Sequence, residues 1–65
     1  MCLARVRFDE SPASAEPVMI DVERIEATEQ GLVLTGLLGE SRTIRGSVKM
    51  IDFMESVVWV EKGKD

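Results

Sequence analysis

The sequence lacks histidine and tyrosine, and it holds a single cysteine, Cys2, among its 65 residues. One cysteine cannot form an internal disulfide, and without histidine a conventional zinc site is not expected. No Ser–His or Cys–His pair is present to activate a nucleophile, and no glycine pattern matches a phosphate-binding loop. These absences predict that the protein is not an enzyme, and they leave Cys2 as its most focused chemical group.

The chain is also short, which points to a single domain over residues 1–65. A domain of this size hides only roughly 60% of the surface that its unfolded chain exposes. Small domains without disulfides or structural metals are commonly stabilised by oligomerisation. The hydrophobic content is 45%, although only 5% of the residues are aromatic. We therefore expect a homodimer that buries a further apolar face.

Basic residues are outnumbered, with eight Lys and Arg against twelve Asp and Glu, for a net charge of −4. Proteins that bind nucleic acids usually carry a basic stripe that displaces counterions from phosphates. Arg42, Arg45 and Lys49 could form a local basic strip, which we interpret as a solvated strand face. The acidic group formed by Asp21, Glu23, Glu26 and Glu29 is interpreted in the same way. Nucleic acid is therefore not the expected partner.

Long apolar runs are missing, since none approaches the roughly 20 residues that span a bilayer. The amino terminus also lacks the charged region and apolar stretch of a secretory signal. A lone free thiol suits a reducing compartment. We expect a cytoplasmic protein that does not associate with membranes.

What the sequence does have is alternation with a period of two, which indicates β-strands. In the first segment Cys2, Ala4, Val6 and Phe8 point to one face, so Cys2 begins the same row as the core residues. The stretch 9–17 gathers serine, proline, alanine and acidic residues, and it is predicted to be a loop.

A second strand is predicted to begin near Val18, and its apolar pattern changes phase. Its apolar residues are Val18, Ile20, Val22, Ile25 and Ala27. The first three occupy even positions and share one face, whereas the last two occupy odd positions. Such a phase change reverses the side chains unless the strand contains a bulge. We predict a bulge near Glu23–Arg24, with a short helical turn as the alternative.

Further strands are predicted at residues 32–38, 42–45, 48–53 and 57–61, separated by turns at Gly31, Gly39 and Gly46. The 32–38 strand is apolar on both faces, which suggests a protein neighbour on its outer side. Short strands joined by tight turns predict an all-β fold. We expect a five- to six-stranded, partly open barrel or a strongly bent antiparallel sheet.

Two other residue types are potential ligands or contact groups. Met1, Met19, Met50 and Met54 could offer thioethers to copper(I), but methionine more often fills gaps in a core, and we adopt that interpretation. Trp59 could stack on a nucleic-acid base. We interpret it instead as a core or interface anchor.

Cys2 itself has two interpretations. Free cysteine is among the most buried residue types, which favours a packing role. A terminal position, by contrast, leaves a thiol accessible. Removal of Met1 would place an α-amine on Cys2, and a thiolate with an adjacent amine or amidate forms a five-membered chelate. Two chains would then supply the four planar nitrogen and sulfur ligands that Ni(II) and Cu(II) favour, with the ion on a two-fold axis.

The segments MCLARV and LLGESRTIRGSVKMIDFMESVVWVE resemble the CooT family of small nickel-binding proteins, which assist the maturation of carbon monoxide dehydrogenase. The family has also been labelled a predicted RNA-binding family. The similarity covers nearly the whole chain except the 9–17 loop. Its specific parts are the Met–Cys start, the turn at residues 38–40 and the step at residues 44–46.

The resemblance implies a compact β-barrel homodimer that binds Ni(II) through Cys2 and serves a client metalloenzyme. Many members carry a histidine at the turn before the last strand, where this chain has Ser56, so that auxiliary ligand is not carried over. The absence of a histidine-rich tail favours nickel delivery or sensing over storage. The alternative is a small RNA-binding or protein-interaction β-barrel with no metal, in which Cys2 is a packing residue.

Overall fold

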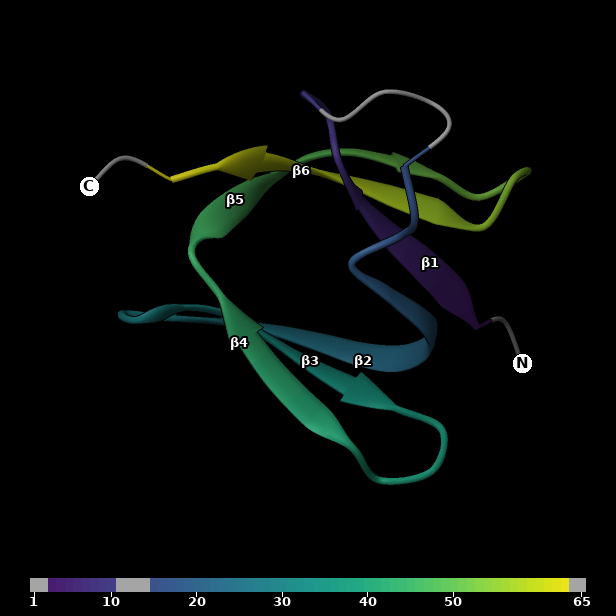
Figure 1. Ribbon diagram of the computed structural model, residues 1–65, viewed down its shortest axis with the longest axis horizontal. Helices are drawn as coiled ribbons and strands as arrows, with labels where there is room; N and C mark the ends of the chain where they lie inside the picture. The colour runs from purple at the N-terminus through teal and green to yellow at the C-terminus, as the bar shows by residue number, and fades with distance from the viewer. Residues whose placement is uncertain (1–2, 11–14, 64–65) are drawn as a thin grey trace.

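The computed structural model describes residues 3–10 and 15–63, and all regular structure in them is β-strand. The strands are β1 (Ala4–Phe8), β2 (Met19–Thr28), β3 (Gly31–Gly36), β4 (Ser41–Ile44), β5 (Gly46–Asp52) and β6 (Val57–Lys62) (Figure 1). The prediction of an all-β fold is confirmed. None of these described segments forms a helix that could cross a bilayer.

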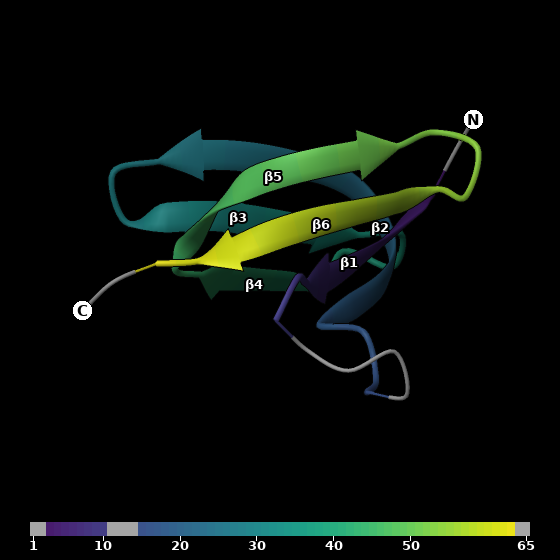
Figure 2. The same ribbon diagram turned by 90° about the horizontal axis from the view of Figure 1, so that it is seen from above.

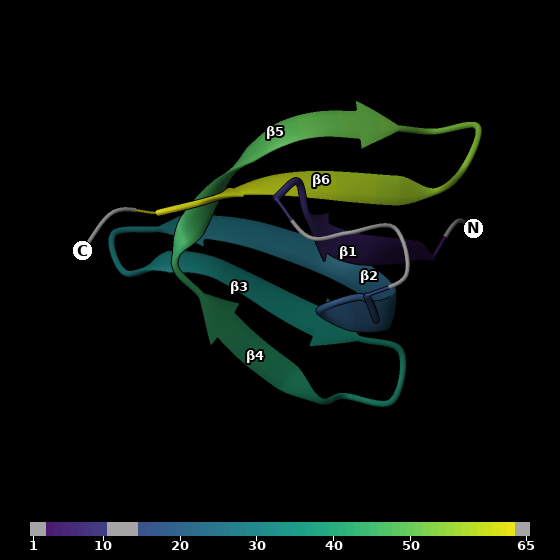
Figure 3. The same ribbon diagram turned by 45° about the horizontal axis from the view of Figure 1, so that its top comes forward.

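The six strands form one sheet in the order β4-β3-β2-β1-β6-β5. The sheet bends so that β5 and β6 lie across from β3 and β4 (Figures 1 and 3). Strands β3 and β5 contact each other, but β4 and β5 remain the two edges of the sheet. The fold is therefore a bent, partly open barrel, as the spacing of the strands predicted.

One part of the sheet prediction needs correction, because β1 and β6 pair in parallel. Arg5 lies opposite Val57 and Phe8 lies opposite Val60, whereas every other strand pair is antiparallel. A parallel pair needs a long connection between its strands. Here four strands supply that connection, so the first and last described strands lie side by side within the sheet.

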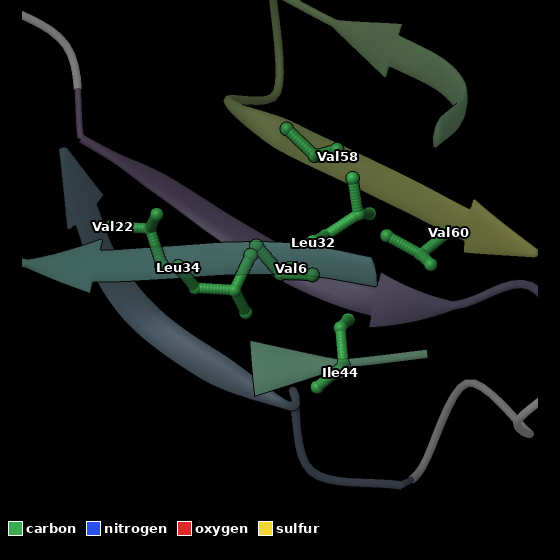
Figure 4. Packing of buried hydrophobic residues seen from close by; sticks show 7 residues of the cluster. All are labelled: Val6, Val22, Leu32, Leu34, Ile44, Val58 and Val60. Carbon is green, nitrogen blue, oxygen red and sulfur yellow. The ribbon is translucent and has the colours of Figure 1, made fainter. Parts of the chain in front are cut away.

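The core lies inside the bend and consists almost entirely of aliphatic side chains (Figure 4). Its buried residues are Val6, Val22, Leu32, Leu34, Ile44, Val58 and Val60. No buried charged residue occurs in the described part of the chain. The inward row predicted for the first strand is confirmed for Ala4, Val6 and Phe8. Cys2, which would begin that row, lies outside the described residues.

The predicted bulge in the second strand is confirmed. The register of β2 against β3 shifts between Val22 and Arg24, which lie two positions apart on β2 but face adjacent positions on β3. The extra residue reverses the alternation, so Val22 and Ile25 both pack toward the core despite an odd spacing.

A second irregularity in β2 was not predicted. Met19 and Val22 are three positions apart on β2, but their partners on β1, Val6 and Ala4, are only two positions apart. Asp21, between Met19 and Val22, adopts a φ of 52°. This bulge turns Met19 toward the core and leaves Ile20 55% exposed. The expectation that Ile20 shares the face of Val22 is therefore wrong, because an even spacing no longer means a common face across the bulge.

The apolar residues near the turns also differ from prediction. Strand β3 ends at Gly36, so Leu37 and Leu38 lie in the following turn and are 50% and 89% exposed. Met50 and Met54 are 51% and 94% exposed, and the core-filling role predicted for them is wrong. Met19 does pack against the core.

Candidate functional site

The start of β1 is the part of the described structure that lies next in sequence to Cys2. It is held on both sides by its neighbours in the sheet. Ala4 lies opposite Val22 of β2, and the backbone N–H of Arg5 donates to the carbonyl oxygen of Ser56 at 2.9 Å. These contacts fix where the described chain enters the sheet.

Leu3 and Ala4 line an apolar cavity of about 240 Å³ at this end of the barrel. The cavity lies between β2 on one side and the ends of β5 and β6 on the other. Its apolar walls include Val22, Ile25 and Ile51. The bend of the sheet, together with the bulges of β2, leaves this opening where β2 and β5 do not pair.

Charged residues of both signs also line this cavity. Glu23 and Arg24 come from β2 and are exposed, and Asp52 comes from the end of β5. Arg24 has no hydrogen bond or ion pair with any other described residue. The cavity is therefore an apolar hollow with charges of both signs on its β2 side and a carboxylate on its β5 side.

The turn between β5 and β6 forms one wall of the cavity. Asp52 Oδ1 accepts a hydrogen bond from the backbone N–H of Glu55 at 3.1 Å, which closes the turn. Ser56 adopts a φ of 58° before the chain enters β6. Phe53 lines the cavity and is 83% exposed, and Met54 beside it is 94% exposed. The turn thus holds two large apolar side chains in solvent next to an apolar hollow.

Two turns and the start of one strand lie at the same end of the molecule. Figures 1 and 3 show the start of β1, the β3–β4 turn and the β5–β6 turn at one end of the long axis. The β2–β3 turn and the end of β6 lie at the other end, as Figure 2 also shows. The exposed leucines, Phe53 and Met54 therefore share this end with the start of β1.

No group of three or more histidine, cysteine, aspartate or glutamate side chains that could hold a metal occurs among residues 3–10 and 15–63. The acidic group of Asp21, Glu23, Glu26 and Glu29 is exposed, as predicted. Cys2, the metal ligand expected from the sequence, lies outside the described residues.

The basic residues singled out in the sequence do not gather. Arg42 lies on β4 and donates from Nη1 to the carbonyl oxygen of Val18 at 2.8 Å. Lys49 lies on the opposite edge strand, β5, and pairs with Asp9 at 2.8 Å. The hydrogen bond and charge of Asp9 raise the pKa of Lys49 above its ordinary value of 10.5. These cations hold loops in place and form no common surface.

A different basic group lies on the outer face of β1. Arg5 and Arg7 line a shallow groove with Val57 and Trp59 of the neighbouring β6, and Arg7 lies opposite Trp59 in the sheet. Arg7 also donates from Nη1 to the carbonyl oxygen of Ala15 at 2.9 Å. Trp59 is half-buried and does not belong to the core cluster. Alternation predicted that both arginines point outward, but nothing in the sequence indicated that Trp59 would lie beside them.

Residues 1–62 match the family model of the CO dehydrogenase accessory protein CooT. The fold is also similar to the crystal structure of a candidate CooT from Carboxydothermus hydrogenoformans, with a TM-score of 0.84 and 21% sequence identity. That comparison covers 97% of this chain and 100% of the other. No curated protein matches the chain. The family model and the similar fold therefore both relate this chain to CooT proteins.

Proposed function

Because the chain belongs to the CooT family of CO dehydrogenase accessory proteins, we propose that it is a homodimer that binds Ni(II) through Cys2. In this role it supplies nickel to, or senses nickel for, a client CO dehydrogenase in the cytoplasm, and it catalyses no reaction itself. The family match carries the proposal, since it includes the Met–Cys start of the chain.

The chemistry of the chain agrees with this role. A thiolate and an adjacent main-chain nitrogen of one Cys2 form a chelate, and a second copy completes four ligands. Square-planar nitrogen and sulfur coordination is the arrangement that Ni(II) favours. The described residues hold no competing group of metal ligands, so a single ion between two chains is the expected stoichiometry.

Metal binding through Cys2 has a testable pH dependence. The thiol must lose its proton before it binds the metal, so nickel affinity should rise with pH until the thiol is fully ionised. Titration of nickel into protein from which Met1 has been removed should produce thiolate-to-metal absorption at one ion per dimer. Native mass spectrometry of the same sample gives methionine removal, dimer state and metal content together.

A Cys2→Ser variant should lose this absorption and bind nickel at least about a hundredfold more weakly, because the hydroxyl remains protonated where a thiol ionises. Met50→Ser is the matched control, since it removes an exposed sulfur that the proposal does not use. Equal nickel binding by wild type and Cys2→Ser would refute the proposal.

A second candidate function is single-stranded RNA binding, and the groove of Arg5, Arg7 and Trp59 is the observation that favours it. Bases stack on aromatic side chains, and arginines contact phosphates. The net charge of −4 and the acidic Asp52 and Glu55 in the same groove oppose it. A gel shift at low salt that Trp59→Ala abolishes would support this function, and no shift at low salt would exclude it.

A further inference from the structure

The outer face of the sheet carries a shallow groove along β6, on the side away from the core. We define the outer groove by the residues that line it, which are Arg5, Arg7, Asp52, Glu55, Val57 and Trp59. We propose that the outer groove binds an extended segment of another protein that presents a cationic side chain and a carboxylate three residues apart. This inference goes beyond the proposed function, because it depends on neither Cys2 nor nickel.

The strand register places charges of opposite sign on the two sides of the outer groove. Val57 of β6 pairs with Arg5 of β1 on one side and with Asp52 of β5 on the other, and residues that pair directly share a face of a sheet. Glu55, in the β5–β6 turn, adds a second carboxylate to the Asp52 side. The side chain of Arg5 has no hydrogen bond or ion pair with the described residues, although both carboxylates line the same groove. Its charge therefore remains available to a carboxylate of a partner.

Between the charged sides, the outer groove has an apolar floor that does not belong to the core. Val57 is buried and Trp59 is half-buried, yet neither is part of the aliphatic cluster inside the bend. Trp59 pairs with Arg7 of β1 and with Met50 of β5, which is 51% exposed. Trp, Arg and Met are enriched in protein interfaces, and Trp and Arg are among the residues that dominate binding energy. The only tryptophan of the chain thus lies where a protein partner can contact it.

The separation of the two charged sides fits a segment in the polyproline II conformation. Arg5 and Asp52 lie on strands with β6 between them, so their Cα atoms are about 9.6 Å apart, twice the spacing of neighbouring strands. In polyproline II, residues i and i+3 lie on one side of the chain, about 9.3 Å apart. Aromatic-lined grooves bind such preformed segments at a low cost in entropy. A cation at position i then faces Asp52 while a carboxylate at position i+3 faces Arg5.

The mixed charge of the outer groove distinguishes this partner from a nucleic acid. Single-stranded RNA presents phosphates along its whole length, and Asp52 and Glu55 repel them. The net charge of −4 opposes RNA further. A protein segment can carry both signs at a defined spacing, so it can match both sides of the groove at once. The groove therefore favours a segment of mixed charge over a polyanion.

Fluorescence of Trp59 reports on the outer groove directly, since the chain has no other tryptophan and no tyrosine. The probe is the capped peptide Gly-Lys-Pro-Pro-Glu-Gly, in which Lys and Glu are three residues apart and the prolines favour polyproline II. Titration into the wild type at low salt should give a saturable change in fluorescence, and added salt should weaken binding. The absence of a saturable change would overturn the inference.

Two matched peptides test whether both charges matter. One carries Lys at both charged positions and the other carries Glu at both. Each should bind about tenfold more weakly than the mixed-charge peptide, because each places a like charge against one side of the outer groove. Equal binding of all three peptides would contradict the proposed recognition.

Arg5→Gln should weaken binding of the mixed-charge peptide by about tenfold, because the peptide carboxylate loses its partner. Arg24→Gln is the matched control, since it removes the same charge from a residue outside the outer groove that also has no ion pair in the described chain. It should bind as the wild type does. Arg5→Glu should instead prefer the peptide with Lys at both positions, a gain that a misfolded variant cannot produce. An unchanged preference would refute the role of Arg5.

Two further measurements separate the inference from the functions proposed above. Cys2→Ser should bind the mixed-charge peptide as the wild type does, even where it has lost nickel, and loss of peptide binding in this variant would sink the inference. If single-stranded RNA changes the fluorescence of Trp59 while the mixed-charge peptide does not, the outer groove belongs to the RNA-binding function and the inference fails.

Discussion

At the scale of single residues, backbone conformation constrains this chain as strongly as packing does. Five described residues have a positive φ, and two of them, Asp21 and Ser56, are not glycine. Both lie beside the cavity, Asp21 next to Val22 and Ser56 in its lining. Such conformations cost about 1–3 kcal/mol each, so the surrounding sheet must hold them. The wall of the candidate site is therefore built from backbone that the rest of the fold keeps in place.

Gly31 provides a test of this constraint. It has a φ of 132°, and a Cβ there would overlap the carbonyl oxygen of Ile44 on the adjacent strand. Gly39 has a φ of 90° but open space around it. We expect Gly31→Ala to lower the free energy of unfolding by about 3 kcal/mol, through both strain and overlap. Gly39→Ala should cost about 1 kcal/mol through conformation alone. Urea denaturation measures both, and equal losses would contradict this account.

At the scale of elements, one ion pair joins the edge strand β5 to the end of β1. Lys49 of β5 reaches Asp9, beyond the end of β1, although β6 lies between the two strands. The two side chains are 56% and 21% exposed. Lys49 also lies between the exposed Val48 and Met50 on this edge, and an edge lysine is one way that proteins discourage pairing with foreign strands.

This pair predicts a specific pH dependence of stability. The folded pKa of Lys49 lies above its ordinary value of 10.5, so its stabilising contribution is fully present below pH 10.5. It is lost as the pH rises through the folded pKa. Wild type should therefore be more stable than Lys49→Met at neutral pH, and the difference should shrink only above pH 10.5. Urea denaturation across this range measures it.

Lys62→Met is the matched control for that experiment, since Lys62 makes no ion pair within the described residues. The difference in stability between wild type and Lys62→Met should not shrink above pH 10.5, because Lys62 has no such ion pair to lose. A difference between wild type and Lys49→Met that persists at high pH would contradict the assignment of the effect to this pair.

The elements also show which parts of the structure the sequence could predict. Alternation and phase gave the strands and the bulge near Glu23–Arg24, because both are local properties of the pattern. The bulge at Asp21 was missed, since Ile20 and Val22 keep an even spacing and nothing in their types reports a positive φ. The parallel pairing of β1 with β6 was missed because pairing between distant strands is a property of the closed sheet.

The candidate site was predictable to a smaller extent. Cys2 stood out because the chain has no other thiol, and it remains a prediction outside the described residues. The cavity could not be foreseen, since its lining comes from β1, β2, β5, β6 and the β5–β6 turn. Phe53 was assigned to a strand, whereas it lies in a turn and projects into solvent. Only the three-dimensional arrangement relates it to Leu3.

At the scale of the whole molecule, the proposed homodimer makes folding and association part of one equilibrium. A dimer that unfolds to two chains has a melting temperature that depends on protein concentration. With the entropy of unfolding typical of two 65-residue chains, a tenfold dilution should lower the Tm by about 5 °C. A wild-type Tm that is the same at all concentrations would show that the monomer folds alone.

The parallel contact between β1 and β6 has a further consequence for how the protein is made. More than fifty residues separate Arg5 from its partner Val57, and β6 also joins β5 to the rest of the sheet. At about 5–20 residues per second, β1 leaves the ribosome several seconds before the strand that must lie beside it. A nascent chain that stops before Val57 lacks part of one wall of the cavity and one of the two strands that flank β1. Ribosomal stalling in the last quarter of the message would thus produce chains that carry Cys2 but lack the framework to position it.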